Sequence, residues 1–554
     1  MGKKNLLFLL LLKLTESSHP GEDFACPRKC SCRMFEIKRV SCRKMGLTTI
    51  PKNIPNTTNY LNLESNVIRK IHANEFSTFR ELRRLNLDDN SLTHIHHDSF
   101  TGLQMLKILS LSSNRLKCID NGTFSKTPNL QMLMLANNQL TIVRTHMFSG
   151  LYHLKHLQLN NNLLSKVEKG SFRDLFSTTS LELNGNELSE IDKDVFSEMP
   201  LLKRLDLSSN KLQHIDGNVF NGSRLLQHLL LSGNQLERIS GQTFVPLGVI
   251  ETIDLSNNTL TSLEGNCFIA QGKLTTLLLN DNILSKLDSK MFFGLYSLQE
   301  LDLRRNRIRV ITDGAFNNLN NLQMLLLSNN NIHSIYPCTF TGLTSLTLLI
   351  LKGNVINSIA YGSFYQVPNL SELDISENQL TTISGPMFYG LNKLEDLDVS
   401  NNQLSSFDNH VLTYMPRLNN LLLFGNRFSC SCSHQLILTS HTLSTVTIDC
   451  MLPLKNTYWT IRPTATNTLG FSWTSWNYLK SCSDVNTRRT NALVRMSPCV
   501  TCSTTNSPMC TKTTPKMTNT LPNAGCVLFM FTMPTRVSST GDGRELESIL
   551  VPKK

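Results

Sequence analysis

The segment LNLESNVI at residues 61–68 recurs as LNLDDNSL at residues 85–92 and as LSLSSNRL at residues 109–116. The pattern continues with a period of 24 residues, without slippage, across most of the 554-residue chain. It places an asparagine at sixteen equivalent positions: Asn66, Asn90, Asn114, Asn138, Asn162, Asn186, Asn210, Asn234, Asn258, Asn282, Asn306, Asn330, Asn354, Asn378, Asn402 and Asn426. A period of this length is typical of stacked structural units, so the sequence predicts one repeat array instead of several independent globular domains.

Apolar residues accompany each asparagine at fixed offsets. Leu85 and Leu87 stand five and three residues before Asn90, and Leu92 stands two residues after it. Alternating apolar positions predict a short strand with one buried face. An asparagine amide both donates and accepts hydrogen bonds, so stacked copies can satisfy backbone groups that a tight bend would otherwise leave unpaired.

A phenylalanine follows each of the first fourteen asparagines by ten residues. These residues are Phe76, Phe100, Phe124, Phe148, Phe172, Phe196, Phe220, Phe244, Phe268, Phe292, Phe316, Phe340, Phe364 and Phe388. The fifteenth such position is Leu412. Stacked rings at constant spacing predict a hydrophobic spine on the side away from the strands, with each ring contributing about 1.5 to 3 kcal/mol on burial.

The pattern LxxLxLxxNxLxxIxxxxFxxLxx resembles the extracellular leucine-rich repeat family, which includes Slit proteins, Toll receptor ectodomains and secreted leucine-rich glycoproteins. The resemblance implies an α/β leucine-rich repeat solenoid, curved like a horseshoe, with a parallel sheet on its concave face and disulfide caps. Sixteen strands at the usual spacing would extend about 75 Å. One repeat departs from the pattern, because Thr178 stands where its first leucine is expected, and we expect a local loosening of the core there.

The sequence predicts five regions. Lys3, Lys4 and the apolar run from Leu6 to Leu12 indicate a signal peptide at residues 1–18. A cysteine-rich cap at residues 19–56 precedes the sixteen repeats of residues 57–429. A second cysteine-rich cap is expected at residues 430–482, and a tail rich in Ser, Thr and Pro at residues 483–554.

Most of the 15 cysteines lie near the two ends of the array. The resemblance implies disulfides Cys26–Cys32 and Cys30–Cys42 in the first cap, and Cys430–Cys450 and Cys432–Cys482 in the second. A zinc site is the alternative for the first group. The second cap lacks the family's tryptophan after its first cysteine pair. Inside the repeats, Cys118, Cys267 and Cys338 are expected to be buried free thiols.

Charge is concentrated at the ends of the chain. Residues 1–56 and residues 430–554 each carry a net charge of +7, while residues 57–429 carry −2. This distribution argues against a nucleic-acid channel along the array. Beyond the signal peptide no segment approaches the ~20 apolar residues of a membrane helix. The cysteine content favours an oxidising compartment, so we expect a secreted, extracellular protein.

Enzyme motifs are missing from the sequence: there is no phosphate-binding glycine loop, no G-x-S-x-G and no H-E-x-x-H. We therefore predict no catalysis and no cofactor. His94 and His96 flank the buried position of Ile95 and could meet a metal ion, with His97 and Asp98 close by. A solvated loop is the interpretation we favour, so no metal site is predicted.

Function then falls to the strand positions that face outward, at six, four and two residues before each asparagine. In repeats 12 to 16 they form an apolar group, then an acidic group, then two apolar residues. The members are Met324, Leu326, Leu348 and Ile350, then Glu372, Asp374, Asp396 and Asp398, then Leu422 and Phe424. An apolar anchor beside a charge block predicts a protein ligand or cell-surface receptor with a basic, partly apolar surface. The alternatives are that these columns vary neutrally, or that a glycan or the tail covers them.

Two further surface features are predicted. Seven basic residues in the first cap could hold glycosaminoglycan or another acidic polymer, although caps carry solvated charges in any case. They are Arg28, Lys29, Arg33, Lys38, Arg39, Arg43 and Lys44. N-glycosylation is expected at the sequons of Asn56, Asn121, Asn221 and Asn257.

The sequence therefore predicts a secreted, non-enzymatic scaffold that binds a protein on its concave face, in cell adhesion, matrix organisation or receptor signalling. One alternative is a receptor ectodomain whose membrane segment is missing from this chain. Another is a structural matrix protein that binds glycosaminoglycan or collagen. Fold resemblance predicts a mode of binding and does not identify the partner.

Overall fold

The computed structural model describes residues 26–33, 38–407, 409–428, 443–449 and 458–461. The chain divides into two units, Met1–Arg488 and Arg489–Lys554, and all described residues belong to the first. The signal peptide, the tail and the cysteines Cys430, Cys432, Cys450 and Cys482 lie outside the described residues.

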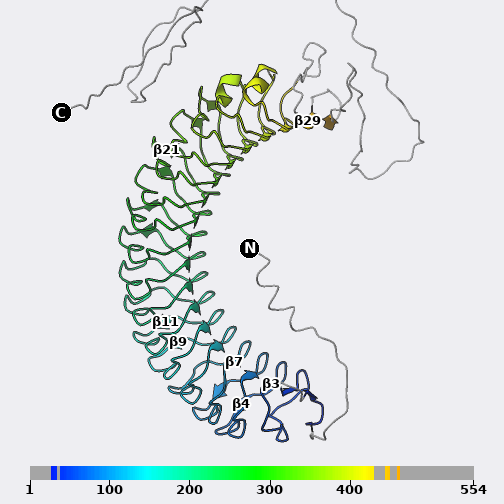
Figure 1. The fold of residues 1–554 in the computed structure, drawn as a ribbon, viewed down its shortest axis with the longest axis vertical. Helices are drawn as coiled ribbons and strands as arrows, with labels where there is room; N and C mark the ends of the chain where they lie inside the picture. The colour runs from blue at the N-terminus through cyan, green and yellow to red at the C-terminus, as the bar shows by residue number, and fades with distance from the viewer. Residues whose placement is uncertain (1–25, 34–37, 408, 429–442, 450–457, 462–554) are drawn as a thin grey trace, which may run out of the picture. The chain divides into compact units, whose positions relative to one another are not determined.

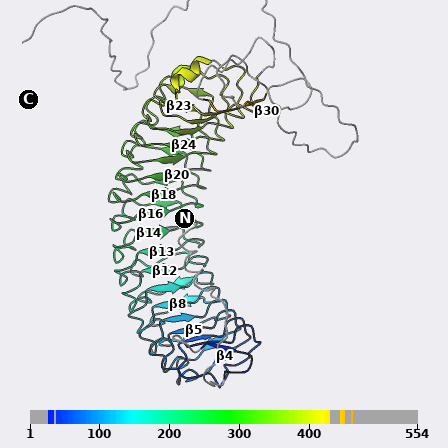
Figure 2. The same ribbon diagram turned by 45° about the vertical axis from the view of Figure 1, so that its right-hand side comes forward.

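Each repeat contributes one three-residue strand to a single parallel sheet. The sixteen strands are β3 (Tyr60–Asn62), β5 (Arg84–Asn86), β7 (Ile108–Ser110), β8 (Met132–Met134), β10 (His156–Gln158), β12 (Ser180–Glu182), β13 (Arg204–Asp206), β14 (His228–Leu230), β16 (Thr252–Asp254), β18 (Thr276–Leu278), β20 (Glu300–Asp302), β22 (Met324–Leu326), β24 (Leu348–Ile350), β26 (Glu372–Asp374), β27 (Asp396–Asp398) and β28 (Asn420–Leu422). Neighbouring strands pair residue for residue with a shift of 24, as Leu301 does with Leu325. They line the inner side of an arc in chain order (Figures 1 and 2). The predicted leucine-rich repeat solenoid is confirmed.

The outer side of the arc is built mainly from turns. Five pairs of two-residue strands lie there: β4 (Lys70–Ile71) with β6 (His94–Ile95), β9 (Ile142–Val143) with β11 (Lys166–Val167), β15 (Arg238–Ile239) with β17 (Ser262–Leu263), β19 (Lys286–Leu287) with β21 (Val310–Ile311), and β23 (Ser334–Ile335) with β25 (Ser358–Ile359). Two 3-10 helices, η1 (Gly385–Phe388) and η2 (Asn409–Tyr414), occur near the end of the array. The helical part of this solenoid is therefore short within the described residues.

The asparagines form the predicted ladder. The Nδ2 of Asn210 donates to the carbonyl oxygens of Leu183 and Leu207 at 3.0 Å each, and its Oδ1 accepts the backbone N–H of Leu188 at 3.1 Å. All sixteen asparagines are buried. The residue before each of them has a positive φ, as Ser209 does at 52°, and this left-handed residue turns the chain out of the strand.

All fourteen phenylalanines are buried, with at most 1% of their surface exposed. Rings of successive repeats stack with centroid distances such as 6.1 Å between Phe292 and Phe316. Thr178, which replaces a leucine of the pattern, is also fully buried, and its hydroxyl donates to the carbonyl of Leu154 at 3.0 Å. The expected loosening is therefore absent there, because the hydroxyl has a partner.

Short antiparallel strands flank the array at both ends. At the start, β1 (Ser31–Arg33) pairs with β2 (Arg39–Ser41), which continues in parallel to β3. Disulfides join Cys26 to Cys32 and Cys30 to Cys42, the two bonds that the family resemblance implies. At the other end, β29 (Thr445–Asp449) extends the sheet from β28 and pairs with β30 (Tyr458–Ile461).

The cysteines inside the repeats differ from one another. Cys267 is buried and free, as predicted, and burial raises the pKa of its thiol to about 12. Cys118 is free but exposed, so the prediction of burial was wrong there. The prediction was also wrong for Cys338, which is disulfide-bonded. The repeat position of a cysteine predicted neither outcome, because each of the three sits at a different offset from the asparagine.

Candidate partner-binding face

Alternation along each strand directs two side chains to the concave face of the sheet. In β22 the central Leu325 is fully buried, whereas Met324 before it keeps part of its surface exposed. The parallel register aligns equivalent residues of successive repeats in columns across the sheet. Outward side chains from five strands, β22 to β28, therefore meet on one continuous surface.

The four predicted apolar residues form a square on β22 and β24. Met324 pairs in register with Leu348, and Leu326 pairs with Ile350. Met324, Leu348 and Ile350 are half-buried, so a partner could cover them further. Leu326 is only 9% exposed and therefore offers little contact surface.

The four predicted carboxylates form the adjacent square on β26 and β27. Glu372 pairs in register with Asp396, and Asp374 pairs with Asp398. Burial raises the pKa of Glu372 above its ordinary value, and the charges of Asp396 and Asp374 raise it further. Burial also raises the pKa of Asp398, and repulsion from Asp374 adds to this effect. Ionised carboxylates in this square repel each other, which favours a cationic partner.

Two of these carboxylates also serve the backbone. Asp374 accepts the N–H of Ser376 at 2.9 Å, and Asp398 accepts the N–H of Ser400 at 2.8 Å. These bonds help to fix the turn that follows each strand. Asp374 and Asp398 thus have a structural role that sequence reasoning did not separate from the electrostatic one.

Leu422 and Phe424 lie at the far side of the acidic square. Leu422 is on β28 in register with Asp398, and Phe424 follows two residues later; both are half-buried. Asn420 of the same strand donates from Nδ2 to the carboxylate of Asp396. The acidic square is therefore bordered by apolar or amide side chains on both β24 and β28.

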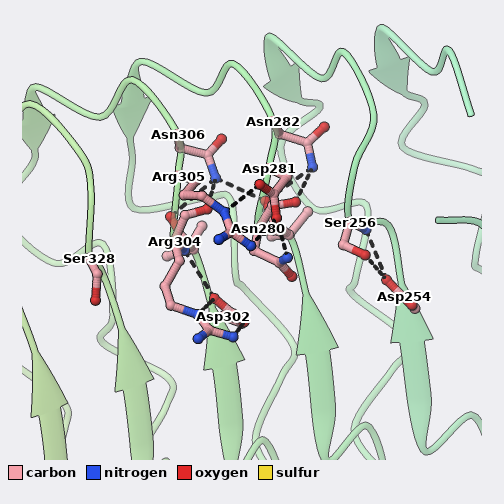
Figure 3. A network of polar contacts seen from close by, with 12 residues as sticks. Asp254, Ser256, Asn280, Asp281, Asn282, Asp302, Arg304, Arg305, Asn306 and Ser328 are labelled. Atoms are coloured by element: carbon pink, nitrogen blue, oxygen red, sulfur yellow. Dashed lines mark hydrogen bonds and ion pairs between the residues drawn. The ribbon is translucent and has the colours of Figure 1, made fainter. Parts of the chain in front are cut away.

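On the opposite side, a buried carboxylate borders the apolar square, because Asp302 pairs in register with Leu326. Figure 3 shows this carboxylate beside Arg304. Asp302 of β20 is 2% exposed and binds the guanidinium of Arg304 through both oxygens, with Nη2 to Oδ2 at 2.6 Å. Arg305 makes a separate ion pair with Asp281 of the previous repeat. Sequence reasoning missed this pairing because Arg304 and Asp302 belong to two different outward columns.

The seven predicted basic residues of the first cap occupy several local elements. Arg43 donates to Glu64 at 2.8 Å, while Lys29 and Lys44 lie in turns with positive φ of 74° and 58°. Arg33 and Arg39 are register partners on β1 and β2, and Lys38 stands just before Arg39. Arg28 is exposed. Of the seven, only Lys38 and Arg39 lie at the start of a strand of the parallel sheet, β2, which pairs with β3.

The four asparagines that are predicted to carry glycans are exposed: Asn56, Asn121, Asn221 and Asn257. In three of the sequons the hydroxyl residue is fully buried. The Oγ1 of Thr58 donates to the carbonyl of Pro55 at 2.6 Å, and that of Thr123 donates to Asp120 at 2.8 Å. The hydroxyl groups of Thr58 and Thr123 therefore have hydrogen-bond partners within their own turns, whether or not the asparagine carries a glycan.

The histidine-rich turn is arranged differently from the sequence expectation. His96, His97 and Asp98 offer ligand atoms that all lie within 4.8 Å of one another. His97 Nε2 lies 2.9 Å from Asp98 Oδ2, and the Nδ1 of His96 accepts the backbone N–H of Asp98. His94 instead lies 4.0 Å from Asp120. These contacts engage one ring nitrogen each of His96 and His97 and one carboxylate oxygen of Asp98.

Comparison with known proteins gives a consistent result. The sequence profile described as Leucine rich repeat matches residues 80–140, 128–188, 176–236, 224–284, 272–332, 323–380 and 368–428. The chain is 43% identical to human Leucine-rich repeat-containing protein 4 over 60 residues, which are 11% of this chain and 9% of that protein. It is 37% identical to Leucine-rich repeat-containing G-protein coupled receptor 5A of Xenopus laevis over 79 residues, which are 14% of this chain and 9% of that protein. The matched segments span about a tenth of these relatives' length.

Among solved structures, a chain of the Drosophila Toll–Spatzle complex superposes with a TM-score of 0.56 and 23% identity. The alignment covers 68% of this chain and 55% of that chain. This likeness supports the fold. Within the described residues, no helix combines the length and the apolar character needed to cross a membrane.

Proposed function

Because the chain belongs to the leucine-rich repeat family, we propose that it is a secreted, non-enzymatic scaffold that binds a protein partner on the concave face of β22 to β28. In this proposal residues 57–429 carry the site, and residues 19–56 and 430–482 cap the array. The relatives include a receptor, which favours a role at the cell surface or in the matrix.

The observation that carries the proposal is the apolar square beside the carboxylate square. The register places Leu348 directly next to Glu372, so apolar and acidic side chains meet without an intervening strand. Apolar side chains left partly open on a sheet face gain free energy when a partner covers them. The carboxylates would guide a basic partner to this spot and fix its orientation.

The positive charge of Lys352 reduces the negative charge that a partner would meet on this face. Its Nζ lies 3.0 Å from Glu377 Oε1, at the edge of the face beyond Ile350. The hydrogen bond to Glu377 raises the pKa of Lys352, so its ammonium group stays charged. We therefore expect the partner's cations to lie over Glu372 and Asp396, away from Lys352.

The test substitutes residues that contribute little to the stability of the fold. Leu326 and Asp374 are unsuitable, because the first is nearly buried and the second holds a backbone N–H. Leu348→Arg with Glu372→Lys instead changes partly exposed contact surface and raises the net charge by three. Glu251→Lys with Thr252→Arg makes the same charge change at the start of β16, four repeats away.

A photo-crosslinking residue at position 348, compared with one at position 252, first captures and identifies the partner on cell surfaces or matrix. The affinity of that partner is then measured for both double variants. We expect the 348/372 variant to be secreted normally and to lose at least tenfold in affinity, while the 251/252 variant stays within twofold. Unchanged affinity of the 348/372 variant would overturn the proposal.

A further inference from the structure

Two columns of side chains mark the place where the chain enters each strand of the sheet. One column holds the residue just before each strand, such as Arg83, and the other holds the first strand residue, such as Arg84. The backbone locks the first column into a ladder, because the N–H of Lys107 donates to the carbonyl of Arg83 at 2.8 Å. The same bond recurs at 2.8 to 2.9 Å in every repeat from Asn59 to Lys203.

Charge is fully segregated along these two columns. Between Lys38 and Arg204 they hold eight cationic residues and no Asp or Glu: Lys38, Arg39, Arg83, Arg84, Lys107, Lys155, Lys203 and Arg204. From Gln227 to Asn420 the same columns hold no Lys or Arg and five acidic residues: Glu251, Glu300, Glu372, Glu395 and Asp396. The N-terminal half of this sheet edge is therefore positive and the C-terminal half negative. We call the eight cationic residues the basic stripe.

Most of the basic stripe is available to a ligand. Among the described residues, its only ion pair joins Arg204 to Asp206 at 3.5 Å. Arg83, Lys107, Lys155 and Lys203 are exposed.

The acidic side chains next to the stripe are engaged by other groups. Glu64 pairs with Arg43. Asp88 accepts from the hydroxyl of Ser110 and, at 2.8 Å, from the N–H of Ser112. Glu182 accepts from Gln158 at 3.2 Å. Glu64, Asp88 and Glu182 lie outside the two columns and are outnumbered by the eight cations of the stripe, so the field along the stripe stays positive.

The stripe is long and narrow, and it follows the arc of the sheet (Figure 1). It runs from β2 to β13, which is seven strand spacings or about 34 Å. Its cations recur in one or two columns, so they would meet an extended chain of negative groups and not a single small anion. A linear polyanion thus fits the geometry better than a compact ligand does.

We propose that the basic stripe binds a linear sulfated polysaccharide. Single-stranded nucleic acid is the other linear polyanion, and its binding relies on aromatic side chains on which bases stack. Tyr60 is the one Phe, Tyr or Trp in the stripe's columns, and the guanidinium groups of Arg39 and Arg84 lie 6.0 and 5.6 Å from its ring centroid. With that ring occupied, the two columns offer charge without a free aromatic ring for base stacking, which favours a sulfated sugar chain over a nucleic acid.

This inference goes beyond the proposed protein-binding face, since the stripe occupies the other half of the sheet. It also differs from the seven-residue cluster of the first cap, of which only Lys38 and Arg39 belong to the stripe. The stripe predicts that most affinity resides in repeats 2 to 7.

The test compares two fourfold variants of the full-length secreted protein. The stripe variant carries Arg83→Gln, Lys107→Gln, Lys155→Gln and Lys203→Gln. The control variant carries Lys126→Gln, Arg173→Gln, Lys193→Gln and Lys286→Gln, four exposed cations outside the two columns. Heparan sulfate binding is measured at several salt concentrations, and single-stranded RNA of similar length and charge serves as the competing probe. Circular dichroism and thermal unfolding verify that both variants are folded.

We expect the stripe variant to lose at least tenfold in heparan sulfate affinity near physiological salt, with a weaker salt dependence, and the control to stay within twofold. Equal losses in both variants would overturn the proposal, because charge alone and not its position would then decide binding. Tighter binding of RNA than of heparan sulfate would also overturn it. The Leu348→Arg, Glu372→Lys variant should keep its heparan sulfate affinity, which separates this test from that of the protein site.

Discussion

The side-chain amide of Asn306 donates a hydrogen bond of 2.9 Å to the carbonyl oxygen of Leu279, which lies 27 residues earlier in the chain. The Oδ1 of Asn306 accepts the N–H of Leu284 at 3.0 Å. One buried amide thus satisfies backbone groups from both sides of the bend, and the next asparagine repeats the arrangement. Register between repeats is therefore held by side-chain bonds as well as by the sheet.

Asn306→Leu should destabilise the array by about 3 kcal/mol, because the Leu279 carbonyl and the Leu284 N–H would stay buried without partners. Denaturant unfolding of the purified protein measures the loss. Asn320→Leu replaces an exposed asparagine of the next turn and should change stability by less than about 0.5 kcal/mol. Similar losses in both variants would show that the ladder bond contributes little.

Adjacent phenylalanines allow a matched test of the spine. Phe292 is 1% exposed and stacks on Phe316, whereas Phe293 is 36% exposed. Phe292→Ala should cost about 3 to 5 kcal/mol through the cavity that it leaves, and Phe293→Ala should cost less than about 1 kcal/mol. Thermal unfolding of both variants measures the difference, and comparable costs would contradict the assignment of the spine.

The periodic part of the fold was predictable because every repeat meets the same requirement. A position that must be buried, such as that of Phe292, or that must both donate and accept, such as that of Asn306, tolerates few residue types. The residue before each asparagine shows the limit of this reasoning. It adopts a positive φ in all sixteen repeats, but the residue itself is Ser, Asp, Asn, Gly, Arg or Glu. This backbone conformation therefore could not be recognised from one residue type.

The candidate site was predictable in outline only. Strand alternation correctly placed Leu348 and Glu372 on the concave face. It could not show that Leu326 is nearly covered or that Arg304 folds onto Asp302, because these outcomes depend on side-chain contacts between positions that the repeat pattern leaves free. The basic stripe was missed because its members fall into five groups that are far apart in the sequence, at residues 38–39, 83–84, 107, 155 and 203–204.

The two cysteines that are free within the described part of the chain should react very differently. Cys118 is exposed, whereas Cys267 is fully buried and burial raises the pKa of its thiol to about 12. A maleimide reagent at neutral pH should label Cys118 in the folded protein and label Cys267 only after unfolding, since the thiolate is the reactive form. Peptide mass spectrometry locates the label, and labelling of Cys267 under native conditions would contradict the structure at this repeat.

Charge crowding in the acidic square has a consequence for stability. Burial and the neighbouring Asp396 and Asp374 raise the pKa of Glu372 in the folded state. Between the ordinary pKa of a glutamate and this raised value, the folded protein holds more protons than the unfolded chain. Its stability therefore decreases as the pH rises through this window, and the cost is present in full at neutral pH.

Glu372→Gln removes the repulsion without changing the size of the side chain. We expect the variant to be more stable than the wild type at pH 7, by less than about 1 kcal/mol because the site is partly solvated. The difference should vanish as the pH falls below the ordinary glutamate value, where both states of the wild type are protonated. Thermal unfolding from pH 3 to pH 8 measures it, with Glu190→Gln at an exposed position as the control for loss of one charge. A Glu372→Gln protein that is less stable than the wild type at pH 7 would mean that this carboxylate is held by favourable contacts, and the acidic square would then not be poised for a cationic partner.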